Sequence, residues 1–287
     1  MRLVSYGPFG RERLGALIDG GARIVDLQRL DPKLPCDMLD FLRGGFWVNA
    51  RAKLADTRTV GPRAVLERKG VRLGAPVPRP GLIVCVGLNY KDHADEQGVA
   101  YPKAPLLFCK APGAACGPED EIVYPVNVTQ LDYEVELAVI MGRTAKRVTA
   151  AEAHRFIAGY CVFNDVSARC AQFGDQQWFR GKSFDTFAPF GPALVTPDEV
   201  PDPQNLRLKA WVNGELRQDS NTNRMIHDVG HIIEHASAGM TLQPGDVVAT
   251  GTPSGVGIFF KPPKLLKRGD VVELEVEGLG RLANRVA

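Results

Sequence analysis

The feature that most constrains this fold is the excess of strand patterns over helical patterns after residue 81. Ten short segments carry the β-branched, aromatic and alternating apolar residues typical of β-strands, and only two carry a helical pattern. The predicted strands are 82–87, 106–110, 120–125, 132–141, 159–166, 192–196, 206–214, 246–251, 270–278 and 281–286. The predicted helices are 149–152, which opens with a Thr-Ala-Ala-Glu capping box, and 225–238.

So few helices exclude a doubly wound α/β fold, in which a helix follows nearly every strand. We therefore predict a β-rich α+β protein in which a mixed, rolled or barrel-like sheet encloses a site. The dipeptide Asn213-Gly214 lies between two strand patterns and predicts a type I′ hairpin.

The first 76 residues have a different pattern. Short strand patterns at 2–7, 13–19 and 22–27 are accompanied by helical segments at 36–44 and 49–57, which is typical of a small α/β unit. Three alternating prolines then favour an extended connector: Pro76, Pro78 and Pro80. We predict a small N-terminal domain, residues 1–76, and a catalytic domain, residues 77–287.

Composition excludes several classes of partner. The 35 Lys and Arg residues nearly balance the 33 Asp and Glu residues, so no basic excess favours nucleic acid or an anionic membrane. No apolar run resembles a signal peptide or could span a bilayer. The six cysteines include no C-x-x-C pair, which favours a reducing compartment. We therefore expect a cytoplasmic globular protein that binds neither nucleic acid nor membranes.

The segment LDYEVELAVIMG, residues 131–142, places several acids on one face of a predicted strand. Side chains alternate along a strand, so Asp132, Glu134 and Glu136 point the same way. Asp165 ends the next long strand pattern, where it could also cap the following segment. The strand face is therefore either solvated or part of a carboxylate cage. Such a cage would suit Mg²⁺ or Mn²⁺ rather than zinc, which prefers His and Cys.

The segment GLNYKDHADE, residues 87–96, directly follows a predicted strand. His93 and Glu96 lie three residues apart, so one helical turn would bring them to the same face. A carboxylate beside an imidazole fixes its tautomer, which is the arrangement needed in a general base. A polar surface turn is the alternative interpretation.

Other candidate motifs predict no site. Three histidines at i, i+4 and i+8, which are His227, His231 and His235, lie opposite the apolar face of their predicted helix, so we expect that face to be solvated. The glycine-rich segment TGTPSGVG, residues 250–257, matches neither the phosphate-loop nor the dinucleotide pattern. No G-x-S-x-G occurs, so a serine nucleophile of the α/β-hydrolase type is unsupported.

Five segments taken together resemble the fumarylacetoacetate hydrolase family over about residues 80–287. They occur in the family's order: GLNYKDHADE, DYEVELAVIMG, GYCVFNDVSAR, GKSFDTFAPFGPALVT and TGTPSGVG. The first 76 residues are similar to the small unit that precedes this domain in many bacterial and mitochondrial members. The resemblance implies a mixed β-roll, usually in a homodimer. The segment CAQFGDQQWF departs from relatives that carry an aromatic residue before the glutamine, so the pocket wall is expected to differ.

The resemblance also implies residue roles. One Mg²⁺ or Mn²⁺ per chain would be held by Glu134, Glu136 and Asp165, without need of Asp132. The catalytic residues would be His93 and Glu96, on a segment that orders as a lid, together with Lys182 of RGKSFD. The residues that contact the substrate would be Arg169, Gln172 and Thr252.

The implied chemistry is stabilisation of an enolate formed from a small 2-oxo acid, with the metal as Lewis acid. We expect a hydrolase that cleaves a C–C bond in acylpyruvate-type 2,4-dioxo acids. Decarboxylation or keto–enol tautomerisation of oxaloacetate requires the same stabilisation and is the alternative. A non-catalytic 2-oxo acid binding protein is a third possibility, although it would need neither His93 nor Lys182.

Overall fold

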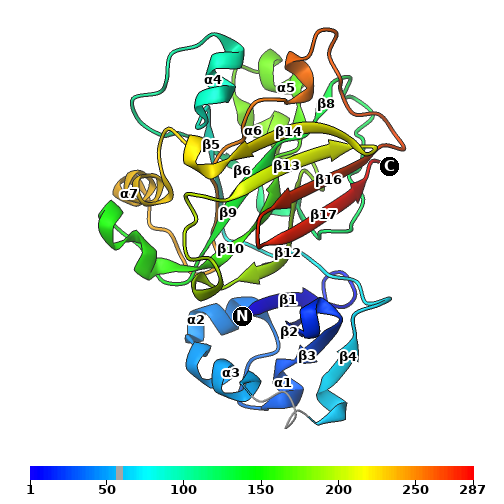
Figure 1. The fold of residues 1–287 in the computed structure, drawn as a ribbon, viewed down its shortest axis with the longest axis vertical. Helices are drawn as coiled ribbons and strands as arrows, with labels where there is room; N and C mark the ends of the chain where they lie inside the picture. Colours follow the sequence, from blue (N-terminus) through cyan, green and yellow to red (C-terminus); the bar gives the residue numbers. More distant parts are fainter. Residues whose placement is uncertain (56–60) are drawn as a thin grey trace.

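The computed structural model describes residues 1–55 and 61–287, and its largest element is a mixed sheet of eleven strands among these residues (Figure 1). The strands are β1 (Arg2–Tyr6), β2 (Arg13–Ile18), β3 (Arg23–Asp26), β4 (Val65–Glu67), β5 (Ile83–Gly87), β6 (Leu106–Lys110), β7 (Ala115–Cys116), β9 (Val135–Met141), β10 (Ile157–Asn164), β12 (Ala188–Val195) and β15 (Val247–Ala249). Their order is β4-β3-β2-β1-β12-β10-β9-β15-β5-β6, with β7 beside β12. The β15–β5 and β12–β7 pairs are parallel and the others are antiparallel.

A second sheet of four strands packs against β10 and β12 of the large sheet. Its strands are β13 (Arg207–Val212), β14 (Glu215–Asn221), β16 (Val271–Val276) and β17 (Gly280–Arg285), in the order β14-β13-β16-β17. Asn213 and Gly214 join β13 to β14 with φ values of 50° and 79°, which confirms the predicted hairpin. A two-stranded ladder pairs β8 (Leu131–Asp132) with β11 (Ser167–Ala168). The strand-rich mixed fold predicted from the sequence is confirmed.

The helices are short and lie at the margins of the sheets. The α-helices are α1 (Leu27–Leu30), α2 (Met38–Gly44), α3 (Trp47–Leu54), α4 (Lys91–Gln97), α5 (Arg169–Gly174), α6 (Trp178–Lys182) and α7 (Val229–Gly239). The 3-10 helices are Asp19–Gly21, Pro62–Ala64, Pro112–Ala114, Ala150–Phe156, Pro197–Glu199, Thr222–Arg224 and Gly257–Phe259. None of the helices in the described part of the chain combines the length and apolar composition needed to cross a membrane.

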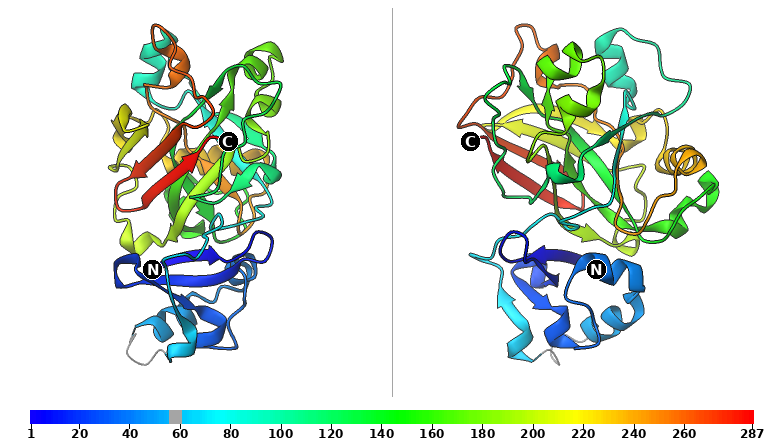
Figure 2. Two further views of the ribbon diagram at one scale, coloured as in Figure 1. Left: turned by 90° about the vertical axis from the view of Figure 1, so that its right-hand side faces the viewer. Right: turned by 180° about the vertical axis from the view of Figure 1, so that it is seen from behind.

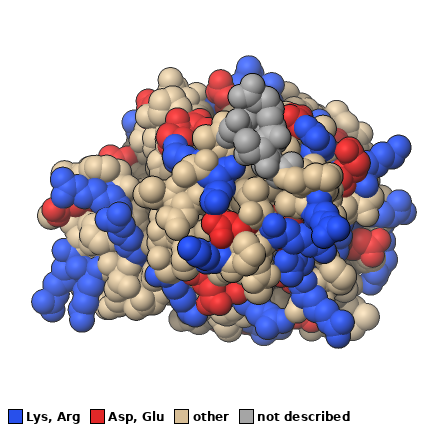
Figure 3. All heavy atoms as spheres, turned by 90° about the horizontal axis from the view of Figure 1, so that it is seen from below, with Lys and Arg blue, Asp and Glu red and all other residues tan. Residues whose placement is uncertain are grey.

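The N-terminal strands extend the large sheet, because β1 pairs with β12 through the register Leu3↔Leu194. Figure 2 shows this unit at one end of the molecule, with α4, α5 and the segment after β15 gathered at the opposite end. The division into domains at residue 76 stays a prediction. On the face seen in Figure 3, basic and acidic side chains are interspersed.

Several predicted elements differ in the structure. Segment 120–125 is not a strand: Ile122 makes only an isolated bridge. The predicted strand 132–141 is broken at Tyr133 and Glu134, between β8 and β9. The predicted helix at 149–152 belongs to a 3-10 helix, and the Thr149 hydroxyl donates to the Glu152 carboxylate instead of capping a backbone N–H. Of the predicted helical segment 49–57, residues 56 and 57 lie outside the described part of the chain.

Helix α7 begins at Val229 rather than Met225, because the Asp228 carboxylate caps it by accepting the His231 N–H at 2.8 Å. His231 and His235 are exposed, as predicted. His227 precedes the helix, and its Nε2 donates to the Pro102 carbonyl at 3.0 Å. The three histidines therefore do not share one helical face.

Replacing His231 with alanine is expected to change the free energy of unfolding by no more than about 0.5 kcal/mol, the usual range for surface sites. The His231 side chain is 60% exposed and its Nδ1 lies 2.8 Å from Asp228 Oδ1, and exposed pairs of this kind contribute little. Denaturant unfolding of the two proteins measures the difference. A drop in bound metal in this variant would contradict the assignment of His231 to a solvated surface.

Candidate active site

Three carboxylates meet where β9 begins and β10 ends. Glu136 lies on β9, Glu134 lies just before it, and Asp165 follows β10. The two strands are antiparallel, with Phe163 opposite Glu136, so the start of one lies beside the end of the other. The side chains of all three acids are buried, and one oxygen from each lies within 4.8 Å of the others. The structure thus brings together the three acids that were predicted as metal ligands.

Three buried cations surround these acids. Lys182 Nζ donates to Glu134 Oε2 at 2.8 Å and to Asp165 Oδ2 at 2.6 Å. Arg169 pairs with the other oxygen of Glu134 at 2.7 Å. Lys110, at the end of β6, pairs with the other oxygen of Asp165. Sequence reasoning missed Lys110, although a lysine ending the apolar run LLFCK was a signal that its charge would be buried.

The cations affect the three carboxylates unequally. Burial would raise the pKa of Glu134, but the adjacent Lys182 and Arg169 outweigh burial and lower this pKa to about 2. Glu136 makes no ion pair within residues 1–55 and 61–287. Burial, followed by the nearby charges of Asp165 and Glu134, raises the pKa of Glu136 well above its usual value. Glu136 is therefore the acid whose charge is least compensated by the protein.

The charges and ligand atoms of this cluster fit a divalent cation. The buried acids are Asp132, Glu134, Glu136 and Asp165. The buried bases are Lys110, Arg169 and Lys182. Four negative and three positive charges leave one net negative charge, which a divalent ion would convert to one net positive charge. Carboxylate oxygens are the ligands preferred by Mg²⁺ and Mn²⁺. The acidic triad can therefore hold a divalent metal, and the site would then attract an anionic substrate.

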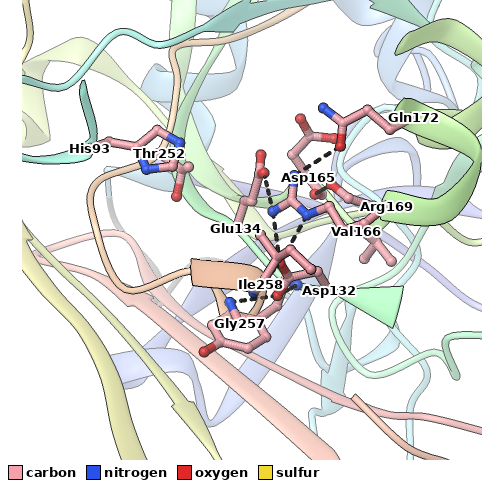
Figure 4. A network of polar contacts seen from close by, with 12 residues as sticks. His93, Asp132, Glu134, Asp165, Val166, Arg169, Gln172, Thr252, Gly257 and Ile258 are labelled. Carbon is pink, nitrogen blue, oxygen red and sulfur yellow. Dashed lines mark hydrogen bonds and ion pairs between the residues drawn. The ribbon is translucent and has the colours of Figure 1, made fainter. Parts of the chain in front are cut away.

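Asp132, the additional acid of the predicted strand, holds Arg169 in place. Its carboxylate accepts N–H groups from Arg169 at 2.9 Å, from Gly257 at 2.7 Å and from Ile258 at 3.0 Å (Figure 4). The same guanidinium donates to Gln172 Oε1 at 3.0 Å. Asp132 therefore orients a cation of the site and is not needed as a ligand.

The glycine-rich segment 250–257 provides backbone donors for the protein's own carboxylates. Gly251 N–H donates to Glu136 at 2.8 Å, and Gly255 N–H donates to Glu96 at 3.1 Å. Gly255 has a φ of 95°, and a Cβ there would lie 2.1 Å from a neighbouring backbone oxygen. Sequence reasoning excluded a nucleotide site here but missed this role, because backbone donors leave no signature in side-chain identity.

Helix α4 carries the predicted His93–Glu96 pair. His93 is buried, and its Nδ1 lies 3.3 Å from Glu96 Oε2. Gln97 was not predicted as a site residue, yet its Nε2 lies 2.9 Å from His93 Nε2. The ring of Phe259 meets the imidazole edge-on, with 5.9 Å between the ring centroids. The helical turn expected from the spacing is present, so the histidine and the carboxylate are in contact.

A cavity of about 70 Å³ lies between α4 and the charged cluster. All the predicted site residues line it except Glu96 and Asp165, which lie behind His93 and Lys182 respectively. Thr252 lines the cavity, but its hydroxyl already donates to the Val135 carbonyl at 2.9 Å. Its contact with a substrate stays a prediction.

An aromatic wall closes one side of the cavity. Trp178 on α6 meets Phe108 on β6 edge-on, with 5.2 Å between the ring centroids. Lys182 Nζ lies 5.3 Å from the centre of the Phe108 ring. A Cβ on Gly87 would lie 2.3 Å from Trp178, so only glycine permits this packing. The segment CAQFGDQQWF, residues 170–179, forms most of α5 and the start of α6, and it adds Phe173 to the wall. The part of the chain that departs from the family pattern therefore does shape the pocket.

Comparisons with known proteins agree over the whole chain. Residues 82–287 match the family model described as Fumarylacetoacetate (FAA) hydrolase C-terminal. The chain is 45% identical to "Oxaloacetate tautomerase FAHD2B, mitochondrial" of Bos taurus, over 100% of this chain and 91% of that protein.

Two solved structures are similar over their full length. The fumarylacetoacetate hydrolase from Exiguobacterium antarcticum has a TM-score of 0.84 and 39% identity, covering 100% of this chain and 99% of that one. The maleylpyruvate hydrolase from Sphingobium sp. SYK-6, in complex with manganese (II) ion and pyruvate, has a TM-score of 0.81 and 32% identity over 100% and 99% of the two chains. The similarity therefore includes the N-terminal unit as well as the part that carries the cluster.

Proposed function

Because the chain belongs to the fumarylacetoacetate hydrolase family, we propose that this enzyme is a divalent-metal-dependent oxaloacetate keto–enol tautomerase. The family predicted from five sequence segments is confirmed. Sequence reasoning placed hydrolysis of acylpyruvates first and the oxaloacetate reactions second. The similarity to the bovine tautomerase, at 45% identity over the whole chain, favours the second of these.

The observation that carries the proposal is the small cavity in which His93 faces the carboxylate cluster. Buried lysine and arginine side chains balance most of the negative charge of this cluster. Tautomerisation needs only a proton acceptor for C3 and positive charge near the 2-oxo oxygen, and His93 and Lys182 both line this cavity. Hydrolysis would also need a water molecule positioned to attack a carbonyl, so tautomerisation requires the fewest groups beyond those that line the cavity.

The protein's own groups have separable tasks in this reaction. When Mg²⁺ or Mn²⁺ is held by Glu134, Glu136 and Asp165, one ion per chain, it supplies Lewis-acid stabilisation of negative charge on the substrate. Burial would lower the pKa of Lys182, but Asp165 and Glu134 raise it above its ordinary value. Lys182 is therefore a fixed cation and not a base.

Proton transfer and orientation belong to the other side chains. His93 takes the proton from C3 and returns it, while Glu96 accepts the Nδ1–H. The Gln172 oxygen is occupied by Arg169, so the Gln172 amide N–H groups are available to a substrate carboxylate (Figure 4). Arg169, already positioned by Asp132, adds positive charge on the same side of the cavity.

Acylpyruvate hydrolysis is the second candidate, supported by the similarity to the Sphingobium maleylpyruvate hydrolase. The manganese (II) ion and pyruvate bound in that relative also support the choice of metal and of a small oxo acid. A homodimer and a cytoplasmic location both stay predictions, and the bovine relative is described as mitochondrial.

The deciding experiment compares three reactions of the purified enzyme, each with Mg²⁺, with Mn²⁺ and after chelation. Decay of enol-oxaloacetate is followed by its ultraviolet absorbance, decarboxylation by released pyruvate, and hydrolysis by loss of acylpyruvate absorbance. We expect the largest kcat/KM for tautomerisation, and chelation should abolish it. A larger kcat/KM on acylpyruvates would establish the hydrolase instead. Binding of 2-oxo acids without turnover of any substrate would identify a binding protein.

A further inference from the structure

Gln97 is the last residue of α4 and lines the cavity beside His93. The two residues are four apart, which places their side chains on one face of the helix. Gln97 Nε2 lies 2.9 Å from His93 Nε2, whereas Glu96 Oε2 lies 3.3 Å from His93 Nδ1. N–H···O hydrogen bonds usually span about 2.7–3.2 Å, so the contact with Glu96 is slightly long. The glutamine therefore makes the closer of the two contacts that hold the imidazole.

The two contacts together specify one tautomer of a neutral imidazole. An ionised carboxylate only accepts hydrogen bonds, so the Glu96 contact at 3.3 Å favours the proton on Nδ1. His93 Nε2 then carries a lone pair, and the Gln97 amide N–H is the donor that matches it. The opposite tautomer would direct the Nδ1 lone pair at the Glu96 carboxylate.

The surroundings of the ring leave few ways to exchange these partners. The second oxygen of Glu96 is held by the Gly255 N–H at 3.1 Å, so this carboxylate stays on the Nδ1 side. Phe259 offers only an apolar ring edge. Among the described residues, the hydrogen-bond partners of the imidazole are Glu96 and Gln97.

We propose that Gln97 is a positioning residue that holds His93 with its proton on Nδ1 and keeps Nε2 as the proton acceptor of the site. The inference rests on the proposed function and adds the atom at which the proton is transferred. As substrate enters, the amide turns away from Nε2. The C3–H bond then breaks, its proton joins Nε2, its electron pair forms the C2–C3 double bond, and the carbonyl pair moves to the 2-oxo oxygen. A proton from solvent joins this oxygen to complete the enol. In the reverse direction the enol loses this proton to solvent, and the proton on Nε2 returns to C3 to give the keto form.

The test is the ¹⁵N spectrum of the histidine rings in the full chain, without metal or substrate. Five histidines are present, and the His93 signals are identified by their loss in a His93→Asn variant. We expect a protonated Nδ1 and an unprotonated Nε2 in the wild type. Gln97→Met, which removes the donor at similar length, should give a mixture of tautomers. Gln97→Glu, which presents a second acceptor while Glu96 stays at Nδ1, should give an imidazolium with protons on both nitrogens.

Kinetics provide the second readout. Gln97→Met should lower kcat by about two- to tenfold, the worth of one neutral hydrogen bond, and Gln97→Glu by about 100-fold, the lower end of the worth of a general base. The matched control is Lys91→Gln on the exposed side of α4, for which we expect wild-type spectra and rates. The inference would be overturned if the wild-type spectrum showed the His93 proton on Nε2. It would also be overturned if both Gln97 variants gave the same His93 ring spectrum as the wild type. Because the spectra need no turnover, failure of the tautomerase assay alone would reject the proposed function and leave this result intact.

Discussion

Replacing His93 with alanine is expected to slow oxaloacetate tautomerisation by about two to four orders of magnitude, the usual contribution of a positioned general base. His93 lines the cavity, and its imidazole is oriented by contacts at both nitrogens. Metal binding should persist, because His93 is not one of the clustered carboxylates. Rates of enol-oxaloacetate decay with saturating Mn²⁺, together with titration of Mn²⁺ by calorimetry, measure both effects.

Oxaloacetate decarboxylation by the same variant should decrease less than tautomerisation. Loss of carbon dioxide requires stabilisation of negative charge but no base at C3, and Lys182 still lines the cavity. The control is His235→Ala on the exposed face of α7, which should behave as wild type. An undiminished tautomerisation rate in His93→Ala would remove the His93–Glu96 pair from the mechanism.

Replacing Glu136 with glutamine is expected to weaken Mn²⁺ and Mg²⁺ binding by more than about 100-fold. Loss of a residue that only contacts a metal ligand typically costs roughly 10- to 100-fold in affinity, and loss of a ligand should cost more. Activity should fall with it. The structural reason is that one oxygen from each of Glu134, Glu136 and Asp165 lies within 4.8 Å of the others. Calorimetry gives the affinity, and the thermal stabilisation produced by added metal should shrink in step. The same losses of affinity are expected for Glu134→Gln and Asp165→Asn.

The variants should differ in stability without metal. Burial, Asp165 and Glu134 raise the pKa of Glu136, so its ionised form opposes folding at neutral pH, and a neutral glutamine should relieve this cost. Glu134→Gln instead removes one of the two buried acid partners of Lys182 and of Arg169, which keep Asp165 and Asp132 respectively. This variant should therefore lose stability, by less than the roughly 3–5 kcal/mol typical of a buried charge left with no partner. Surface variant Glu121→Gln is the control. Unchanged metal affinity in all three triad variants would reject the metal site.

The sequence by itself was sufficient for the fold class and for most of the candidate site. Strand patterns repeat over a few residues, so the strand-rich architecture follows from local alternation. Glu134 and Glu136 are two residues apart, and His93 and Glu96 are three apart, so strand and helix geometry alone predict that each pair shares a face. Asp165, at the end of its strand pattern, was a candidate third member of the carboxylate cage, with a helix cap as the alternative. Its assignment as a ligand and the role of Lys182 required the resemblance, because their partners lie elsewhere in the chain.

Tertiary structure decided the features that depend on contacts between distant segments. Lys110 reaches Asp165 across 55 positions, and Asp132 accepts a backbone N–H of Gly257 across 125. The break in the predicted strand at Tyr133 and the pairing of β1 with β12 also depend on contacts between distant segments. No local pattern encodes them, because burial of a charge or a backbone donor depends on which segments the whole chain packs together.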